Sequence, residues 1–303
     1  MNEPVTNAPF GRFSFDYTAD YAALDRIYRR AVAAIRALDP EHIIFLEGDL
    51  TARVFDGMDV PCAENLVYSS HNYTDVGFGP GPYPGVLQRA YYDRGKQGEY
   101  YDAEKQWEDF ERFSGTRFAR KHNVPLWIGE FGSAYNGPKE EIPDRLRALD
   151  DQIGVFEAFG AHWTIWTYKD VYVMGLLQPA SDSSYIQTTR TALGAKRALA
   201  TDFWMNWVPP TPVVQQVNEL ARQIEAAIGD PRIDPRANER FLGQSTLTNY
   251  VGLLMQPAYA RCFAQMSETE IDRVLQSWSF KNCVPHQGLI EVLKKNMARP
   301  AAE

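Results

Sequence analysis

The sequence is poor in cysteine, and the cysteines that it has are far apart. Cys62, Cys262 and Cys283 are the three cysteines in 303 residues, and their spacing matches neither a zinc site nor a disulfide framework. A single bridge between Cys262 and Cys283 stays open on these grounds. The chain also lacks a glycine-rich phosphate loop and a metal-type histidine cluster. We therefore expect no cofactor and no metal.

Basic residues and long hydrophobic runs are scarce as well. The formal net charge is -8, which argues against a nucleic-acid partner because phosphate binding needs a basic face. No apolar run approaches the length of a membrane span. Aromatic residues, by contrast, are plentiful, with 7 Trp and 16 Tyr. Most such rings fill cores, but flat rings also stack on the faces of sugars, so the composition suits a carbohydrate partner.

Helical and strand patterns alternate along the first two thirds of the chain. Apolar residues at three- and four-residue spacing predict helices over 20–38, 103–121 and 141–159. Short apolar runs bounded by turn residues predict strands near residues 45, 68, 128 and 164. This alternation indicates an α/β fold with a parallel sheet. On the alternation alone, a barrel and a doubly wound sheet both fit.

The segment after Asp170 has a different character. It predicts helices over 213–228, 268–278 and 289–297, and Ser267 with Glu270 forms a capping-box signature. We therefore divide the chain into an α/β domain, residues 1–200, and a helical extension, residues 201–303. No chemical role for the extension follows from its residues.

Two glutamates stand where strands are expected to end. Glu130 closes the apolar run that begins at Leu126, and Glu3 lies in the opening Asn2-Glu3-Pro4. Barrel enzymes keep their chemistry at the carboxyl ends of strands, and a pair of carboxylates there suggests glycoside hydrolysis. We expect Glu47 and Asp49, which follow another strand, to be residues of the rim and not catalysts.

Four short motifs, in order, resemble glycoside hydrolase family 5, the cellulase family of retaining barrel glycosidases. They are Asn2-Glu3-Pro4, His71-Asn72-Tyr73, Gly129-Glu130-Phe131-Gly132 and Trp166-Thr167-Tyr168-Lys169-Asp170. The resemblance runs from residue 1 to about residue 190. It implies that the chain is the C-terminal half of a (β/α)8 TIM barrel, from strand 4 or 5 to strand 8, followed by the helical extension.

The resemblance also implies roles for individual residues. Glu3 matches the acid/base and Glu130 the nucleophile of a double-displacement reaction, in which the two carboxyl groups stand about 5–5.5 Å apart. The resemblance implies five substrate-binding residues: Asn2, His71, Tyr73, Trp166 and Lys169. Among these, Asn2 matches the residue that binds the sugar 2-hydroxyl, Trp166 matches the stacking platform, and Lys169 is close enough to reach substrate hydroxyls. The implied substrate is a β-linked glucan or a related β-glycoside, and a polysaccharide substrate favours secretion.

The chain departs from the family pattern at its start, where the first three strands and most of the fourth have no counterpart. A complete barrel takes about 250 residues, so we interpret the chain as a fragment or truncated gene model. We expect exposed barrel edges to cause self-association and poor activity. The alternative function is a non-catalytic, carbohydrate-binding remnant of such an enzyme. A metal-dependent barrel hydrolase is a third reading, which lacks ligands.

Overall fold

A four-stranded parallel sheet lies at the centre of the fold. In the computed structural model, which describes residues 1–6, 19–90, 94–199, 211–231, 233, 235–240, 242–243 and 248–298, the strand order is β1-β2-β5-β6. These strands are β1 (Ile44–Glu47), β2 (Leu66–His71), β5 (Leu126–Glu130) and β6 (His162–Trp163), and every neighbouring pair is parallel. The predicted α/β fold with a parallel sheet is therefore confirmed.

Helices connect the strands much as the periodicity predicts. They are α1 (Tyr21–Arg36), the short α2 (Asp49–Ala52), α3 (Ala103–Arg112), α4 (Ser114–His122) and α5 (Ile142–Phe159). The single helix predicted over 103–121 is in fact two, because Phe113 adopts an extended backbone with ψ 139° between α3 and α4. The long connection after β2 holds an antiparallel pair, β3 (Gly85–Val86) with β4 (Tyr100–Tyr101).

The helices bury one face of the sheet. Ile128 of β5 packs with Leu149 and Phe156 of α5, and all three are fully buried. A second cluster joins Leu24 of α1 to the β1–β2 side of the sheet. The opposite face is more open, because Phe45 is 48% exposed and packs edge-on against Trp127 at a ring separation of 5.4 Å. This asymmetry follows from strand alternation, which directs successive side chains to opposite faces.

The remaining elements lie beyond β6. They are β7 (Leu177–Pro179), α6 (Ser184–Leu199), α7 (Pro212–Ile228), α8 (Pro235–Arg240), α9 (Thr248–Arg261), α10 (Glu268–Leu275), β8 (Cys283–Pro285) and α11 (Gln287–Met297). The predicted capping box of Ser267 and Glu270 is present. Helix α9 was not predicted, because Pro257 lies inside it and its apolar residues do not follow one face.

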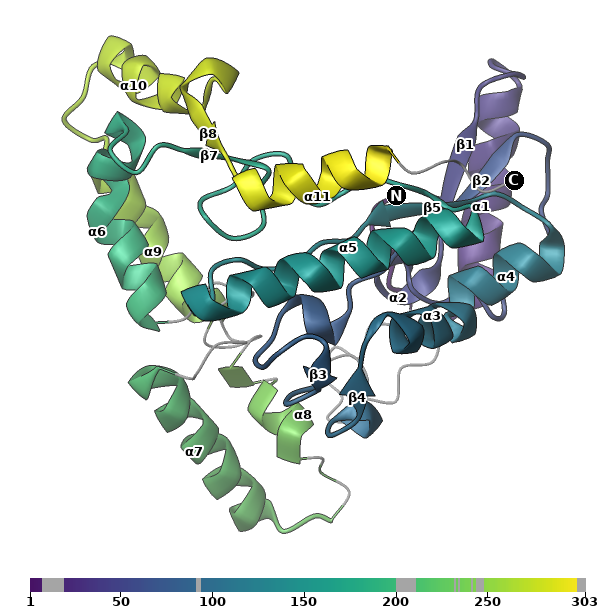
Figure 1. Ribbon diagram of the computed structural model, residues 1–303, viewed down its shortest axis with the longest axis horizontal. Helices are drawn as coiled ribbons and strands as arrows, with labels where there is room; N and C mark the ends of the chain where they lie inside the picture. The colour runs from purple at the N-terminus through teal and green to yellow at the C-terminus, as the bar shows by residue number, and fades with distance from the viewer. Residues whose placement is uncertain are drawn as a thin grey trace.

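The last third of the chain returns to the sheet domain. Figure 1 shows α11 running alongside α5, and Leu289 of α11 is fully buried in the same core cluster as Ile153. Strand β8 pairs with β7 in an antiparallel manner. The described residues after position 200 thus contribute the strand β8 and core contacts in addition to helices. The division at residue 200 stays a prediction.

Two smaller expectations can be compared with the structure. Cys62, Cys262 and Cys283 are all free, so the bridge left open between the last two is absent. None of the helices in the described part of the chain combines the length and apolarity that crossing a bilayer requires.

Candidate active site

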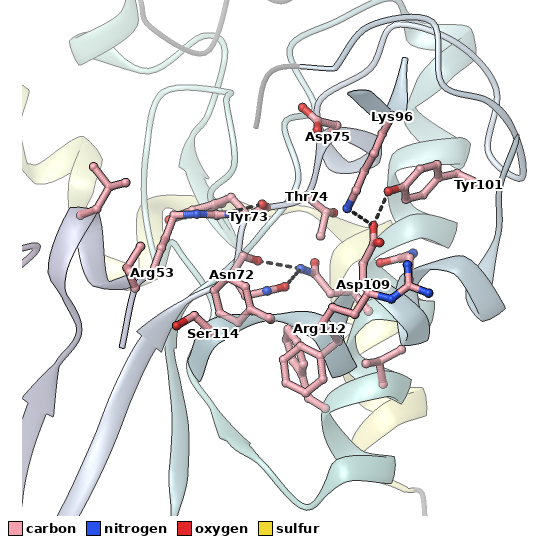
Figure 2. A pocket seen from close by; sticks show the side chains of 18 residues that line it. Arg53, Asn72, Tyr73, Thr74, Asp75, Lys96, Tyr101, Asp109, Arg112 and Ser114 are labelled. Atoms are coloured by element: carbon pink, nitrogen blue, oxygen red, sulfur yellow. Dashed lines mark hydrogen bonds and ion pairs between the residues drawn. The ribbon is translucent and has the colours of Figure 1, made fainter. Parts of the chain in front are cut away.

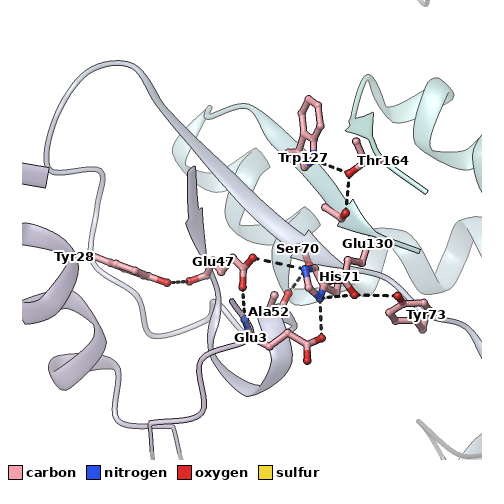
Figure 3. Close-up of polar contacts among 11 residues, drawn as sticks. Glu3, Tyr28, Glu47, Ala52, Ser70, His71, Tyr73, Trp127, Glu130 and Thr164 are labelled. Carbon is pink, nitrogen blue, oxygen red and sulfur yellow. Dashed lines mark hydrogen bonds and ion pairs between the residues drawn. The ribbon is translucent and has the colours of Figure 1, made fainter. Parts of the chain in front are cut away.

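Three strands of the sheet end at one edge with an ionisable side chain each. Glu47 is the last residue of β1, His71 of β2 and Glu130 of β5. Parallel pairing brings these ends together, and His71 pairs directly with Glu130 after a register shift at Ser70. Figure 3 shows the three side chains converging at this edge. The local sequence therefore determines which residues stand at the strand ends, and the parallel register brings their side chains close together.

Glu3 reaches the same edge from a segment that is not a strand. Its backbone N–H donates to Oε2 of Glu47 at 2.6 Å. The N–H of Thr51 donates to the carbonyl of Pro4 at 3.3 Å, and the N–H of Thr6 donates to Oδ1 of Asp49 at 3.0 Å. Glu47 and the fully buried Asp49 thus fasten the first six residues to the rim. Sequence analysis placed both at the rim but missed this anchoring role, which their position after β1 could have suggested.

His71 occupies the centre of the cluster. Its Nδ1 lies 2.8 Å from Oε1 of Glu3 and 3.5 Å from Oε2 of Glu130, and its Nε2 lies 3.6 Å from Oε1 of Glu47. The side chain is only 3% exposed. Burial alone lowers the pKa of His71, but the hydrogen bond to Glu3 and the nearby negative charges of Glu47 and Glu130 outweigh it and raise the pKa to about 9. The imidazole is therefore protonated at neutral pH.

Two side chains contact the carboxylate of Glu130. The hydroxyl of Tyr73 donates to its Oε2 at 3.0 Å, and Nδ1 of the protonated His71 lies 3.5 Å from the same oxygen. Burial raises the pKa of Glu130 and the charges of Glu3 and Glu47 add to the shift, whereas His71 and Tyr73 oppose it. Tyr73 and His71 thus favour the ionised carboxylate inside a half-buried site.

Ligand atoms of Glu3, His71 and Glu130 lie within 4.8 Å of one another. This places a carboxyl oxygen of Glu3 within reach of one from Glu130, with an imidazolium between them. The same three groups have the chemistry of cation ligands. His71 would first have to lose the proton that its raised pKa retains, because only a neutral imidazole ligates a metal.

Trp166 and Lys169 lie in the loop that follows β6. The N–H of Trp166 donates to the carbonyl of Phe131 at 2.9 Å, immediately after Glu130, and Trp166 as a whole is 43% exposed. Gly132 permits this approach, because a Cβ at that position would lie 2.5 Å from the carbonyl oxygen of Trp166. Lys169 is directed elsewhere, and its Nζ donates to the carbonyl of Trp278 at 2.6 Å. Asn2 is exposed next to Glu3.

A separate cavity of about 480 Å³ lies behind the loop that carries Tyr73. Figure 2 shows it between that loop and helices α3 and α5, with Arg53, Lys96 and Asp109 on its walls. Gln152 of α5 donates to both the backbone carbonyl and the side-chain oxygen of Asn72, at 2.7 and 3.0 Å. These two hydrogen bonds fix the backbone at Asn72, between His71 and Tyr73. Gln152 on the cavity wall therefore also helps to position these two side chains of the candidate active site.

Comparisons with known proteins cover the stretch of chain that carries these motifs. The family model described as cellulase, glycosyl hydrolase family 5, matches residues 1–171. A β-xylosidase of Phanerodontia chrysosporium is 29% identical over 289 residues, which cover 89% of this chain and 56% of that protein. The chain therefore spans about half the length of the curated relative that it matches.

Solved structures of glycosidases are similar over about half of the chain. Endoglucanase Cel5A of Thermotoga maritima is 19% identical with a TM-score of 0.39, and 52% of this chain and 49% of that chain are covered. A second solved structure, that of a glycoside hydrolase, is 19% identical with a TM-score of 0.42, and 58% of this chain and 49% of that chain are covered. The family model itself matches more than half of the chain. The chain belongs to the cellulase family, glycosyl hydrolase family 5.

Proposed function

We propose that this chain carries the catalytic carboxylates of a retaining β-glycosidase. The observation that carries the proposal is the approach of Glu3 and Glu130, whose carboxyl oxygens lie within 4.8 Å of each other on either side of His71. A retaining enzyme needs its two carboxyl groups about 5–5.5 Å apart, whereas an inverting enzyme leaves room for a water at about 6.5–9.5 Å. The short approach supports the retaining route.

In the proposed reaction Glu130 is the nucleophile and Glu3 the acid/base. Glu130 attacks the anomeric carbon while Glu3 donates a proton to the oxygen of the leaving group, and a glycosyl ester forms on Glu130. Glu3 then takes a proton from a water that attacks the same carbon, which releases the sugar with its original configuration and restores both carboxyl groups. Tyr73 and His71 favour the ionised form of Glu130 that attack requires, against the effect of burial.

Two further residues are proposed to bind the sugar that reacts. Asn2 would hydrogen-bond the 2-hydroxyl, a contact that strengthens in the transition state. The exposed indole of Trp166, next to the end of β5, would serve as the stacking platform. The proposed substrate is a β-linked glucan or a related β-glycoside. The ammonium of Lys169 is directed towards the carbonyl of Trp278, so we assign this residue no contact with the reacting sugar.

Covalent trapping tests the assignment of the nucleophile. A mechanism-based fluorosugar should add one glycosyl unit to the full chain, and peptide mapping should place it on Glu130. Glu130→Gln should take up no label, while Glu140→Gln, which alters an exposed carboxylate of the short 3-10 helix Lys139–Glu141, should label like the parent chain. A folded parent chain that stays unlabelled, or that is labelled at another carboxylate, would overturn the proposal.

A carbohydrate-binding remnant without hydrolysis is the second candidate. The observation that favours it is the placement of Glu3, whose side chain is 36% exposed and lies in a segment outside the sheet. An acid/base on such a segment is held less firmly than one on a strand. This candidate predicts sugar binding with no label on Glu130, so the trapping experiment separates the two.

We also propose that the described sheet forms the second half of an eight-stranded barrel. The parallel order β1-β2-β5-β6 supports this, as does a sheet with one face buried under helices and Phe45 exposed on the other. In a barrel, the second face packs against side chains from the remaining strands. The proposal is consistent with self-association of the chain through this face and the sheet edges.

A further inference from the structure

A large cavity adjoins the candidate active site on the side of Trp166. Its volume is about 1120 Å³, slightly above the range of about 300–1,000 Å³ that is usual for small-molecule sites. One wall is the loop that carries Trp166, Lys169 and Asp170, and the facing wall comes from α6, α9 and Trp278. The family model ends at residue 171, so the second wall belongs to the part of the chain beyond the family match.

Direct contacts hold the two walls together. The ammonium of Lys169 donates to the carbonyl of Trp278 at 2.6 Å, across 109 residues of sequence. Behind this contact, the rings of Tyr185 and Trp278 pack edge-on at 5.1 Å, and the hydroxyls of Tyr185 and Tyr259 lie 3.0 Å apart. The second wall is therefore an interlocked aromatic cluster drawn from α6, α9 and the turn after α10.

The lining has the chemistry of a sugar site. Trp166, Tyr172, Tyr259 and Trp278 line the cavity, and aromatic side chains give large contact area with few rotatable bonds. Nδ2 of Asn136, also on the wall, is buried and lacks a hydrogen-bond partner among the residues that the structure describes. An unpaired buried donor costs about 1–3 kcal/mol, which a hydroxyl or carboxylate oxygen of a ligand would recover.

The charge of the lining is opposite to that of the chain. Four of the described residues that line the cavity are cationic: Lys139, Lys169, Lys196 and Arg197. Asp170 is the single acid among the described residues that line the cavity. Its oxygens already accept hydrogen bonds from the N–H groups of Val173 and Met174, at 3.1 and 2.5 Å. A net positive wall in a chain of net charge -8 selects for an anionic group on the ligand.

We propose that this cavity is a second sugar-binding site that accepts a carboxylate-bearing unit of the substrate. The inference rests on the proposed glycosidase function, because Trp166 serves both the reacting sugar and the cavity. The aromatic rings bind the faces of the sugar, and Arg197 with Lys196 binds its carboxylate. The preferred substrate is then a β-linked oligosaccharide that carries an acidic sugar near the cleaved bond.

Ligand binding to the full chain with Glu130→Gln tests the proposal without turnover. Tryptophan fluorescence would be titrated with two β-linked oligosaccharides of equal length, one neutral and one with a single uronic acid. We expect the acidic one to bind about tenfold more tightly, and the preference to weaken as salt screens the charges. Lys196→Gln with Arg197→Gln should abolish the preference. Arg190→Gln, an exposed cation on the same helix but outside the lining, should leave it intact.

A third variant tests the aromatic wall. Tyr259→Ala should weaken the binding of both oligosaccharides by a similar factor and leave their ratio unchanged. Equal affinity for the two oligosaccharides in the Glu130→Gln chain would overturn the inference, and so would a preference that survives the double substitution. Failure of the glycosidase proposal has a different signature, since it removes covalent labelling of Glu130 and leaves these affinities as they are.

Discussion

Nδ1 of His71 lies 2.8 Å from Oε1 of Glu3, although 68 residues separate the two in sequence. This contact ties the start of the chain to the end of β2. It also places a cation between Glu3 and the other carboxylates of the cluster. The charge of His71 therefore contributes to both the geometry of the site and the stability of the fold.

The stability of the protein should depend on the charge of His71. Its pKa in the folded state, about 9, exceeds the value of about 6.5 expected in the unfolded chain. The stabilisation is therefore complete below pH 6.5 and is lost as the pH rises through 9. It amounts to at most about 3 kcal/mol. Urea unfolding should show that the free energy of unfolding falls between pH 7 and 10. His71→Gln should make this fall shallower, whereas His162→Gln, which changes an exposed ring, should leave it unchanged. Equal pH slopes in all three proteins would contradict this account.

Removal of the Tyr73 hydroxyl should raise the pKa of Glu130. Tyr73 donates to Oε2 of Glu130, and a donor to the ionised form lowers the pKa of a carboxyl group. In Tyr73→Phe the titration of the Glu130 carboxyl carbon, followed by NMR, should move to higher pH. Tyr28→Phe is the control, because Tyr28 donates to the backbone carbonyl of Glu47 instead. An unchanged titration in Tyr73→Phe would show that the hydrogen bond is not formed in solution.

Gly132 should tolerate no side chain. A Cβ there would lie 2.5 Å from the carbonyl oxygen of Trp166 and 2.9 Å from Cε of Met174. Gly132→Ala should lower the free energy of unfolding by about 1–3 kcal/mol and weaken sugar binding at Trp166. Gly194 of α6 has open space around it, so Gly194→Ala should stabilise the chain by about 0.4–1 kcal/mol. Chemical denaturation of both variants checks the opposite signs.

The C-terminal helix should be part of the sheet domain's cooperative unit. Leu289 is fully buried in the cluster that contains Leu149 and Phe156, so Leu289→Ala should cost about 2–5 kcal/mol. Leu253, which is 66% exposed, offers a matched change that should cost less than about 0.5 kcal/mol. Unfolding should be monitored by hydrogen exchange in β5. If Leu289→Ala left β5 unaffected, residues 201–303 would form an independent unit.

The exposed face of the sheet should promote self-association. Phe45 is 48% exposed beside Trp127, and apolar sheet surface of this kind pairs readily with another copy. Sedimentation should show a mass that rises with concentration, and Phe45→Ser should reduce the effect. Phe280 is 69% exposed on a turn far along the chain, and Phe280→Ser should change nothing. A parent chain that stays monomeric at high concentration would contradict the prediction.

Sequence reasoning recovered most of the sheet domain because its signals are local. Strands β1, β2 and β5 follow from short apolar runs, and α1 and α5 from helical spacing. The predicted strand near residue 164 is shorter than expected, since β6 spans only His162–Trp163. The capping box at Ser267 was predictable for the same reason, because both partners lie within one turn of helix.

What the sequence alone determined is which side chains stand at the strand ends, since periodicity places Glu130 and His71 there. Tertiary structure decided which of them meet. The anchoring of Glu3 by Glu47, the hydrogen bond from Lys169 to Trp278 and the docking of α11 on α5 join residues far apart in the chain. Such pairings depend on the register of parallel strands and on helix packing, which no local pattern encodes.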